Sequence, residues 1–208
     1  MTSLLVVREY IKNFYIKYEE YLVPVLKFLL ALVSLLMING ELGYMGELKS
    51  PAVVLVPALL CSFMPNNFVL FVAAGFVTLH LYRVSLECAA AALLLFLLLF
   101  LLYFRFSPKS TFLVLLTPML FALKIPYAAP LLAGLLGGPM SAVTVACGVL
   151  IYYMISFMSV NASLLGAAAA ESMLQRFRDV LDGVLADRAM MIVAAAFAVT
   201  TVMVYLVR

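Results

Sequence analysis

The sequence predicts an all-α fold, a polytopic bundle of transmembrane helices with six to eight apolar segments. Hydrophobic residues make up 67% of the 208 residues and charged residues only 11%, whereas soluble domains average about 45–50% and about 25%. The mean hydropathy is +1.20. A water-soluble globular domain would need surface charges that this chain lacks, so that class is excluded. From residue 51 to 158 the charged residues are Arg83, Glu87, Arg105, Lys109 and Lys124.

Residues 1–21 form the first predicted domain, an amphipathic interfacial helix. Through 4–21, apolar and aromatic side chains recur at three- and four-residue spacing, with most charges between them. Such a helix lies at the bilayer surface or docks a partner, and the pattern fits both roles. A first span follows at 22–38. Pro24 stands in its first turn, where a helix tolerates proline.

Residues 22–158 form the predicted transmembrane core, whose helices are short and broken by prolines. A spanning helix needs about 20 apolar residues, yet several predicted segments are clearly shorter. These segments therefore either cross a thinned region or do not cross at all. After the first span, the predicted segments are 51–64, 67–82, 87–104, 110–123, 128–136 and 142–158.

An amphipathic extramembrane helix and a last span complete the predicted order. The extramembrane domain covers 159–188, and within it the stretch 167–188 sets apolar positions against a charged face. Residues 189–208 contain the final transmembrane helix. The side of the membrane on which 159–188 lies stays open, because it depends on whether 126–137 crosses.

Paired prolines indicate a degenerate internal repeat. Pro57 and Pro65 are eight residues apart, as are Pro118 and Pro126, and the two pairs are 61 residues from each other. The apolar residues around Pro57 and Pro118 also align. Each pair interrupts a run of short apolar segments and precedes a longer one.

The two repeat units, about 51–106 and 110–158, each contain three predicted segments. Because three is an odd number, the units have opposite orientations if every segment crosses. Inverted repeats with interrupted helices are typical of secondary transporters, whose substrate site lies near the middle of the membrane. The unopposed basic residues Arg105 and Lys109 place their loop in the cytoplasm. Counting back, we expect a multi-pass protein of the cytoplasmic membrane with a cytoplasmic N-terminus.

The predicted segments 51–82 and 110–137 each form a hairpin that is broken by a proline. The turns of these two hairpins carry the candidate substrate-binding residues. If both hairpins are re-entrant, each enters and leaves the membrane on the same side. The short helices on either side of each turn then reach roughly mid-bilayer at about 1.5 Å per residue, and the two turns meet there. Asn66 and Asn67 of the first turn and Lys124 and Tyr127 of the second would then bind an anionic or polar solute. The simpler alternative is that these residues form ordinary interfacial turns between short, tilted spans.

No catalytic, metal-binding or cofactor-binding motif stands out along the chain. His80 is the only histidine, so the chain lacks the two histidines that an intramembrane metalloprotease needs. Because it lies near the end of a span beside Tyr82 and Arg83, we expect a satisfied interfacial histidine and not the base of a Ser/His dyad. Cys61, Cys88 and Cys147 are widely spaced in apolar runs, where cysteine packs as a small hydrophobe. The basic excess is too small and scattered for nucleic-acid binding. We therefore expect no enzymatic activity, no metal, no cofactor and no nucleic-acid partner.

The stretch from Pro130 to Gly148 resembles sequences of two families of small bacterial membrane proteins. It reads PLLAGLLGGPMSAVTVACG. Its pattern of glycine, proline and apolar residues is similar to a sequence motif of substrate-binding S components of energy-coupling-factor transporters. It is also similar to a stretch of the MreD family of cell-shape proteins. The first resemblance implies a substrate-capture subunit that works with an ATP-driven module. The second implies a scaffold that recruits cell-envelope enzymes.

Two functions remain from the sequence. In the first, the chain is a binding or transport subunit for a small solute, with its site at the interface of the repeat units. In the second, it is a membrane scaffold whose partners, membrane or cytoplasmic subunits, dock on 4–21 and 167–188. The paired short segments favour transport, and the scarcity of intramembrane polar residues favours the scaffold.

Overall fold

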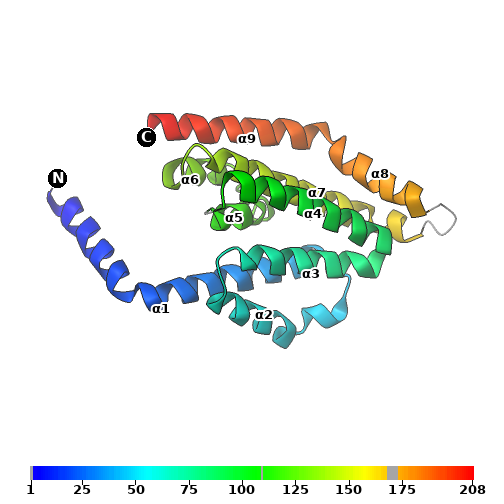
Figure 1. The fold of residues 1–208 in the computed structure, drawn as a ribbon, viewed down its shortest axis with the longest axis horizontal. Helices are drawn as coiled ribbons and strands as arrows, with labels where there is room; N and C mark the ends of the chain where they lie inside the picture. The colour runs from blue at the N-terminus through cyan, green and yellow to red at the C-terminus, as the bar shows by residue number, and fades with distance from the viewer. Residues whose placement is uncertain (1, 109, 168–172) are drawn as a thin grey trace.

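The computed structural model describes residues 2–108, 110–167 and 173–208, and within these ranges all regular secondary structure is helical (Figure 1). This confirms the all-helical class. The elements, in chain order, are α1 (Thr2–Glu41), the 3₁₀ helix η1 (Gly46–Lys49), α2 (Pro51–Phe63), α3 (Phe68–Val84), α4 (Leu86–Phe106), α5 (Thr111–Ala122), α6 (Ala128–Leu136), α7 (Ser141–Ala167), α8 (Met173–Leu185) and α9 (Arg188–Val207).

In the described part of the chain, four helical stretches are long and apolar enough to cross a membrane. They are Lys17–Glu41, Leu86–Phe106, Ser141–Ala162 and Arg188–Val207. The remaining apolar helices, α2, α3, α5 and α6, have 13, 17, 12 and 9 residues. At about 1.5 Å per residue, each is shorter than a hydrocarbon core of about 30 Å.

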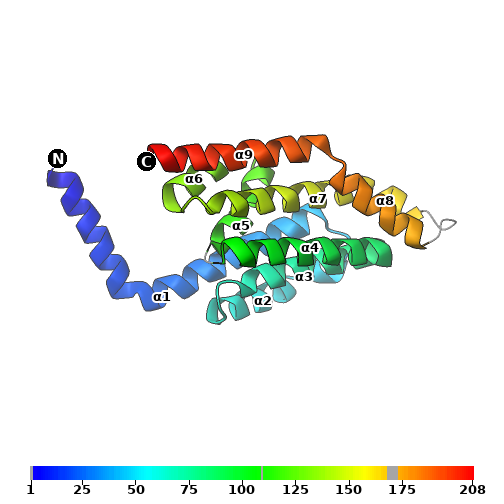
Figure 2. The same cartoon turned by 45° about the horizontal axis from the view of Figure 1, so that its top comes forward.

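Helix α1 joins the predicted interfacial helix and the first span in one element. The chain stays helical through residues 21 and 22 and bends at Tyr18, whose φ of −113° and ψ of 15° are not helical. Pro24 lies inside the helix, where its ring removes a backbone hydrogen bond one turn back and favours a bend. The part before the bend projects away from the bundle (Figures 1 and 2). The prediction that residues 4–21 form an amphipathic helix depends on side chains 4–16, which lie outside the described part of the structure.

The hairpin of α2 and α3 runs along the apolar length of α1. The Ser62 hydroxyl donates to the Pro24 carbonyl at 2.9 Å, and the Lys27 ammonium donates to the Met64 carbonyl at 3.2 Å. These bonds place the turn between α2 and α3 level with the start of the apolar part of α1. The first hairpin therefore extends along most of the span that α1 provides.

The hairpin of α5 and α6 turns back halfway along its neighbours. The Phe121 ring stacks on Tyr152, near the middle of α7, with ring centroids 4.6 Å apart. The Tyr127 ring lies 6.2 Å from that of Phe197, near the middle of α9. The second hairpin therefore enters and leaves the bundle at the same end.

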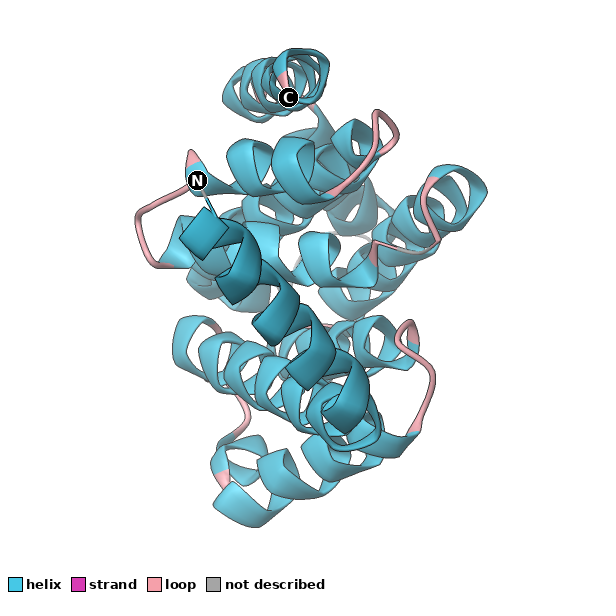
Figure 3. Ribbon diagram, turned by 90° about the vertical axis from the view of Figure 1, so that its left-hand side faces the viewer, coloured by secondary structure: helices cyan, strands magenta, loops and turns pink. Residues whose placement is uncertain are grey.

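Both chain termini lie at one end of the molecule, the end that faces the viewer in Figure 3. The Arg208 guanidinium donates to the Gly137 carbonyl at 3.4 Å, so α9 ends beside the turn that precedes α7. At the far end, the Tyr44 hydroxyl donates to the Ser159 carbonyl at 3.2 Å. The start of the segment 159–188 therefore lies at the end opposite both termini.

Helix α8 packs its apolar face on its own chain. Val180 and Val184 are buried, and the helix contacts α4 and α7. Gly183 meets the Phe157 ring so closely that a Cβ atom would overlap it. Of the predicted amphipathic stretch, residues 168–172 lie outside the described residues. Of the rest, Val180 and Val184 are buried in the chain itself, whereas Leu185 is 56% exposed.

The single histidine is a buried structural residue. His80 is completely buried, its Nδ1 accepts from the Met45 backbone N–H at 3.2 Å, and its Nε2 lies 2.6 Å from Asn39 Oδ1. Asn39 in turn donates to the Leu48 carbonyl at 2.9 Å. This network holds the loop after α1 against the end of α3. The three cysteines are buried without a disulfide in the described structure, which agrees with a packing role.

Candidate functional site

The two predicted residues of the first turn have different surroundings. Asn66 is exposed and Asn67 is half-buried. The Asn67 side-chain oxygen accepts from the Thr111 hydroxyl and, at 3.4 Å, from the Tyr103 hydroxyl. Tyr103 is buried and also lies 3.0 Å from the Thr111 hydroxyl. Asn67 therefore joins the start of α3 to the end of α4 and the start of α5.

The two predicted residues of the second turn are both exposed. Lys124 caps the C-terminus of α5 with a left-handed φ of 62°. Its N–H donates to the Phe121 carbonyl at 2.9 Å, and the Ile125 N–H donates to the Leu120 carbonyl at 2.9 Å. This is the Schellman pattern that ends many helices, usually with glycine at the left-handed position. Tyr127 is 75% exposed and touches Phe197.

The two turns lie at opposite ends of α5. Asn67 bonds to Thr111, the first residue of that helix, whereas Lys124 lies two residues beyond its last residue, Ala122. Twelve helical residues separate them, which is about 18 Å along the axis. The structure therefore does not bring Asn67 together with Lys124. A site that combined both turns would need a rearrangement of α5.

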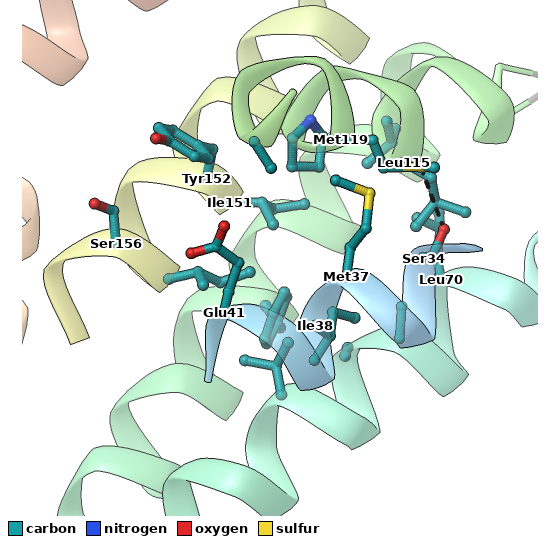
Figure 4. Close-up of a pocket in the computed structure, with 18 of the residues that line it drawn as sticks. Ser34, Met37, Ile38, Glu41, Leu70, Leu115, Met119, Ile151, Tyr152 and Ser156 are labelled. Atoms are coloured by element: carbon teal, nitrogen blue, oxygen red, sulfur yellow. Dashed lines mark hydrogen bonds between the residues drawn. The ribbon is translucent and has the colours of Figure 1, made fainter. Parts of the chain in front are cut away.

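A cavity lies where α5 ends early, between α1, α3, α4, α5 and α7 (Figure 4). Its empty volume is about 790 Å³, part of it open to the surroundings. Helices α3 and α4 belong to the first predicted repeat unit, and α5 and α7 belong to the second. Its lining includes Ser34, Met37, Glu41, Phe96, Phe100, Met119, Ala122, Tyr152 and Ser156.

The polar groups of this cavity are concentrated at one end. The Glu41 carboxylate and the hydroxyls of Tyr152 and Ser156 lie on the same side in Figure 4. Toward the opposite side, the Ser34 hydroxyl is occupied by a 2.7 Å hydrogen bond to the Leu30 carbonyl. The space between is lined by aliphatic, aromatic and methionine side chains. The cavity thus has an apolar body and one polar, negatively charged end.

Glu41 is exposed at the C-terminal end of α1. No lysine or arginine of the described residues forms an ion pair with its carboxylate. Its backbone carbonyl accepts from the Ser159 hydroxyl at 3.4 Å, which anchors the end of α1 to α7. The carboxylate is therefore held beside the cavity while it keeps contact with water.

Sequence reasoning missed this cavity because most of its lining consists of ordinary apolar residues. Glu41 lies outside the predicted first span of 22–38, because the helix continues beyond that span and ends at Glu41. One signal pointed toward the site: the segments 110–123 and 128–136 are too short to fill the depth of a bilayer. Where helices stop halfway, the space beyond their turn must be filled by other side chains, by water or by a ligand.

The fold defines the class of protein, a helical bundle with the architecture of an integral membrane protein. Comparison with protein-family models, curated proteins and solved structures gives no match for this chain. In the described residues, no group of three or more His, Cys, Asp or Glu side chains is placed to hold a metal ion. The chemistry that the cavity offers is binding by apolar contact, hydroxyl groups and one carboxylate.

Proposed function

We propose that this chain is a non-enzymatic membrane protein that binds and moves a small solute, with its site in the cavity between the two repeat units. The observation that carries the proposal is the cavity itself, which is lined by both units and by α1 and is partly open to the surroundings. Ligand sites are typically concave, mainly apolar and furnished with a few converging polar groups. The Glu41 end of this cavity provides such groups.

The helix order supports an inverted repeat. Helices α2 and α5 begin at residues 51 and 111, and α3 and α6 begin at 68 and 128, so both starts recur after 60 residues. The corresponding long helices run in opposite directions. Helix α4 ends near Thr111, at the end of the bundle with the termini, whereas α7 passes Ser159 at the far end. Transporters with this organisation place their substrate between the repeats.

The loop after α4 supports a cytoplasmic location for both termini. Arg105 lies in the last turn of α4, which ends beside Thr111 at the end of the bundle that holds the termini, and no acidic residue is near it in the sequence. Basic residues in short loops favour the cytoplasmic side. In this orientation the polar end of the cavity faces the outer half of the membrane, and α8 lies on the outer side.

Filling the cavity tests the proposed function. Ala122 lines the cavity at the end of α5, whereas its neighbour Leu123 is 59% exposed and does not line it. A solute that binds the folded state raises the unfolding temperature, so thermal unfolding of the purified chain with a panel of solutes identifies ligands. We expect Ala122→Phe to abolish this stabilisation and Leu123→Phe to retain it. Equal stabilisation of both variants would refute the cavity as the site.

One observation favours the scaffold as a second candidate. The N-terminal part of α1 extends away from the bundle, and its ribbon lies apart from the other helices in Figures 1 and 2. This arrangement supports docking of a partner on α1 more than on α8, because Val180 and Val184 of α8 are buried in the chain itself. If the chain is a scaffold, we expect deletion of residues 2–16 to remove co-purifying subunits and to leave solute binding intact.

A further inference from the structure

We propose that the solute is a hydrophobic organic cation whose charged group pairs with Glu41. This inference rests on the proposed function, because it names the ligand class of the same cavity. The residues that line the cavity include one carboxylate and no lysine, arginine or histidine. An anionic ligand would therefore meet a like charge and find no basic partner there.

The geometry of the polar end fits a cationic group that stays partly hydrated. The Glu41 carboxylate and the Tyr152 and Ser156 hydroxyls lie on one side of the cavity (Figure 4). All three offer oxygen acceptors, as an ammonium or related group requires. Because Glu41 is exposed, its ionised form costs no deep burial, and a cation from water can reach it.

The body of the cavity fits an apolar or aromatic frame. Phe96, Phe100 and Tyr152 supply aromatic faces, which attract cations as well as apolar rings. Met37 and Met119 supply flexible thioether side chains that adapt to ligands of different outline. A small inorganic cation would leave this surface uncovered, so the ligand class is an organic cation with substantial apolar area.

Binding of two ions of the same shape and opposite charge tests the inference. The full-length chain is reconstituted in phosphatidylcholine nanodiscs, and equilibrium dialysis measures binding of tetraphenylphosphonium and tetraphenylborate, with empty nanodiscs subtracted. We expect saturable binding of the phosphonium alone. Glu41→Gln should weaken it about tenfold. The matched control Glu47→Gln removes an exposed acid outside the cavity and should leave affinity within about twofold.

A second variant, designed to strengthen binding, keeps the test decisive if the Glu41→Gln protein does not fold. Ser156→Asp adds a second carboxylate at the polar end and should tighten phosphonium binding. Equal binding of both ions, or phosphonium binding unchanged by Glu41→Gln and Ser156→Asp, overturns the cation assignment. If Ala122→Phe still abolishes stabilisation by another solute, the proposed function survives that result. If Ala122→Phe also has no effect, both proposals fail.

Discussion

Lys124 illustrates how a single residue can carry a local cost. Its left-handed backbone is disfavoured for every side chain that has a Cβ atom, and glycine is the usual residue at this cap. The Schellman hydrogen bonds to Phe121 and Leu120 hold it in this conformation. The Lys124 side chain itself is exposed, and it lies level with the middle of α7 and α9.

Replacing Lys124 by glycine should stabilise the protein. The substitution keeps the helix cap and removes the conflict between Cβ and the backbone, which amounts to about 1 kcal/mol. Thermal unfolding in detergent should show a higher midpoint. As a control, Leu123→Gly changes a right-handed position (φ −76°) and should lower the midpoint. A lower midpoint for Lys124→Gly would contradict the cap.

The individual residues differ in how far sequence predicts them. The sequence predicts a satisfied interfacial histidine at His80; the hydrogen bonds to Met45 and Asn39 show that it is satisfied, but its side chain is completely buried. The partners themselves could not be predicted, because Asn39 is 41 residues away in the chain. The same holds for Asn67, whose contacts with Thr111 and Tyr103 depend on how three helices meet.

At the scale of elements, helices α6 and α9 depend on one small residue for their close approach. A Cβ atom at Gly134 would lie 2.6 Å from Val204 Cβ and 2.9 Å from the Thr201 carbonyl. Small residues allow such backbone contact between membrane helices. Gly75 stands near the equivalent place in the first unit, in the interior of α3, yet a Cβ atom there meets nothing within 4 Å.

This contrast gives a matched pair of substitutions. Gly134→Ala should destabilise the protein by about 1–3 kcal/mol, because α9 must shift away from α6. Gly75→Ala should stabilise it by about 0.5–1 kcal/mol, because alanine loses less backbone freedom in a helix. Both changes are read from unfolding midpoints in the same detergent. Equal effects of the two variants would disprove the α6–α9 contact.

Element boundaries follow from the sequence where hydrophobicity and helicity end together. The predicted segments 87–104 and 128–136 correspond closely to α4 and α6. Helix α7 instead continues to Ala167, well past the predicted 142–158, and α1 passes the predicted border at 21 and 22. An apolar run indicates where lipid or core contacts end, whereas a helix can continue through polar residues as long as its hydrogen bonds persist.

At the scale of the whole molecule, the sequence predicted an all-helical membrane architecture but not the cavity. Composition and spacing revealed the short, broken helices of both hairpins. They could not show that the first hairpin runs along most of the apolar part of α1 while the second turns back halfway along its neighbours. That difference separates Asn67 from Lys124 and creates the space beside Met37 and Glu41. It arises from packing between distant segments, which local patterns do not encode.

The most direct test of the central claim, a water-accessible site between the repeat units, is thiol labelling of two neighbouring positions on α1. Met37 lines the cavity, whereas Leu36 is 53% exposed on the outside of the same apolar span. Each is replaced by cysteine in a background without Cys61, Cys88 and Cys147, and intact membranes receive a charged, membrane-impermeant thiol reagent.

The account predicts that Met37→Cys reacts, that added Ala122→Phe blocks this reaction, and that Leu36→Cys stays unreactive in lipid. Two results would contradict the account. In the first, Leu36→Cys reacts and Met37→Cys does not; in the second, Met37→Cys reacts equally with and without Ala122→Phe.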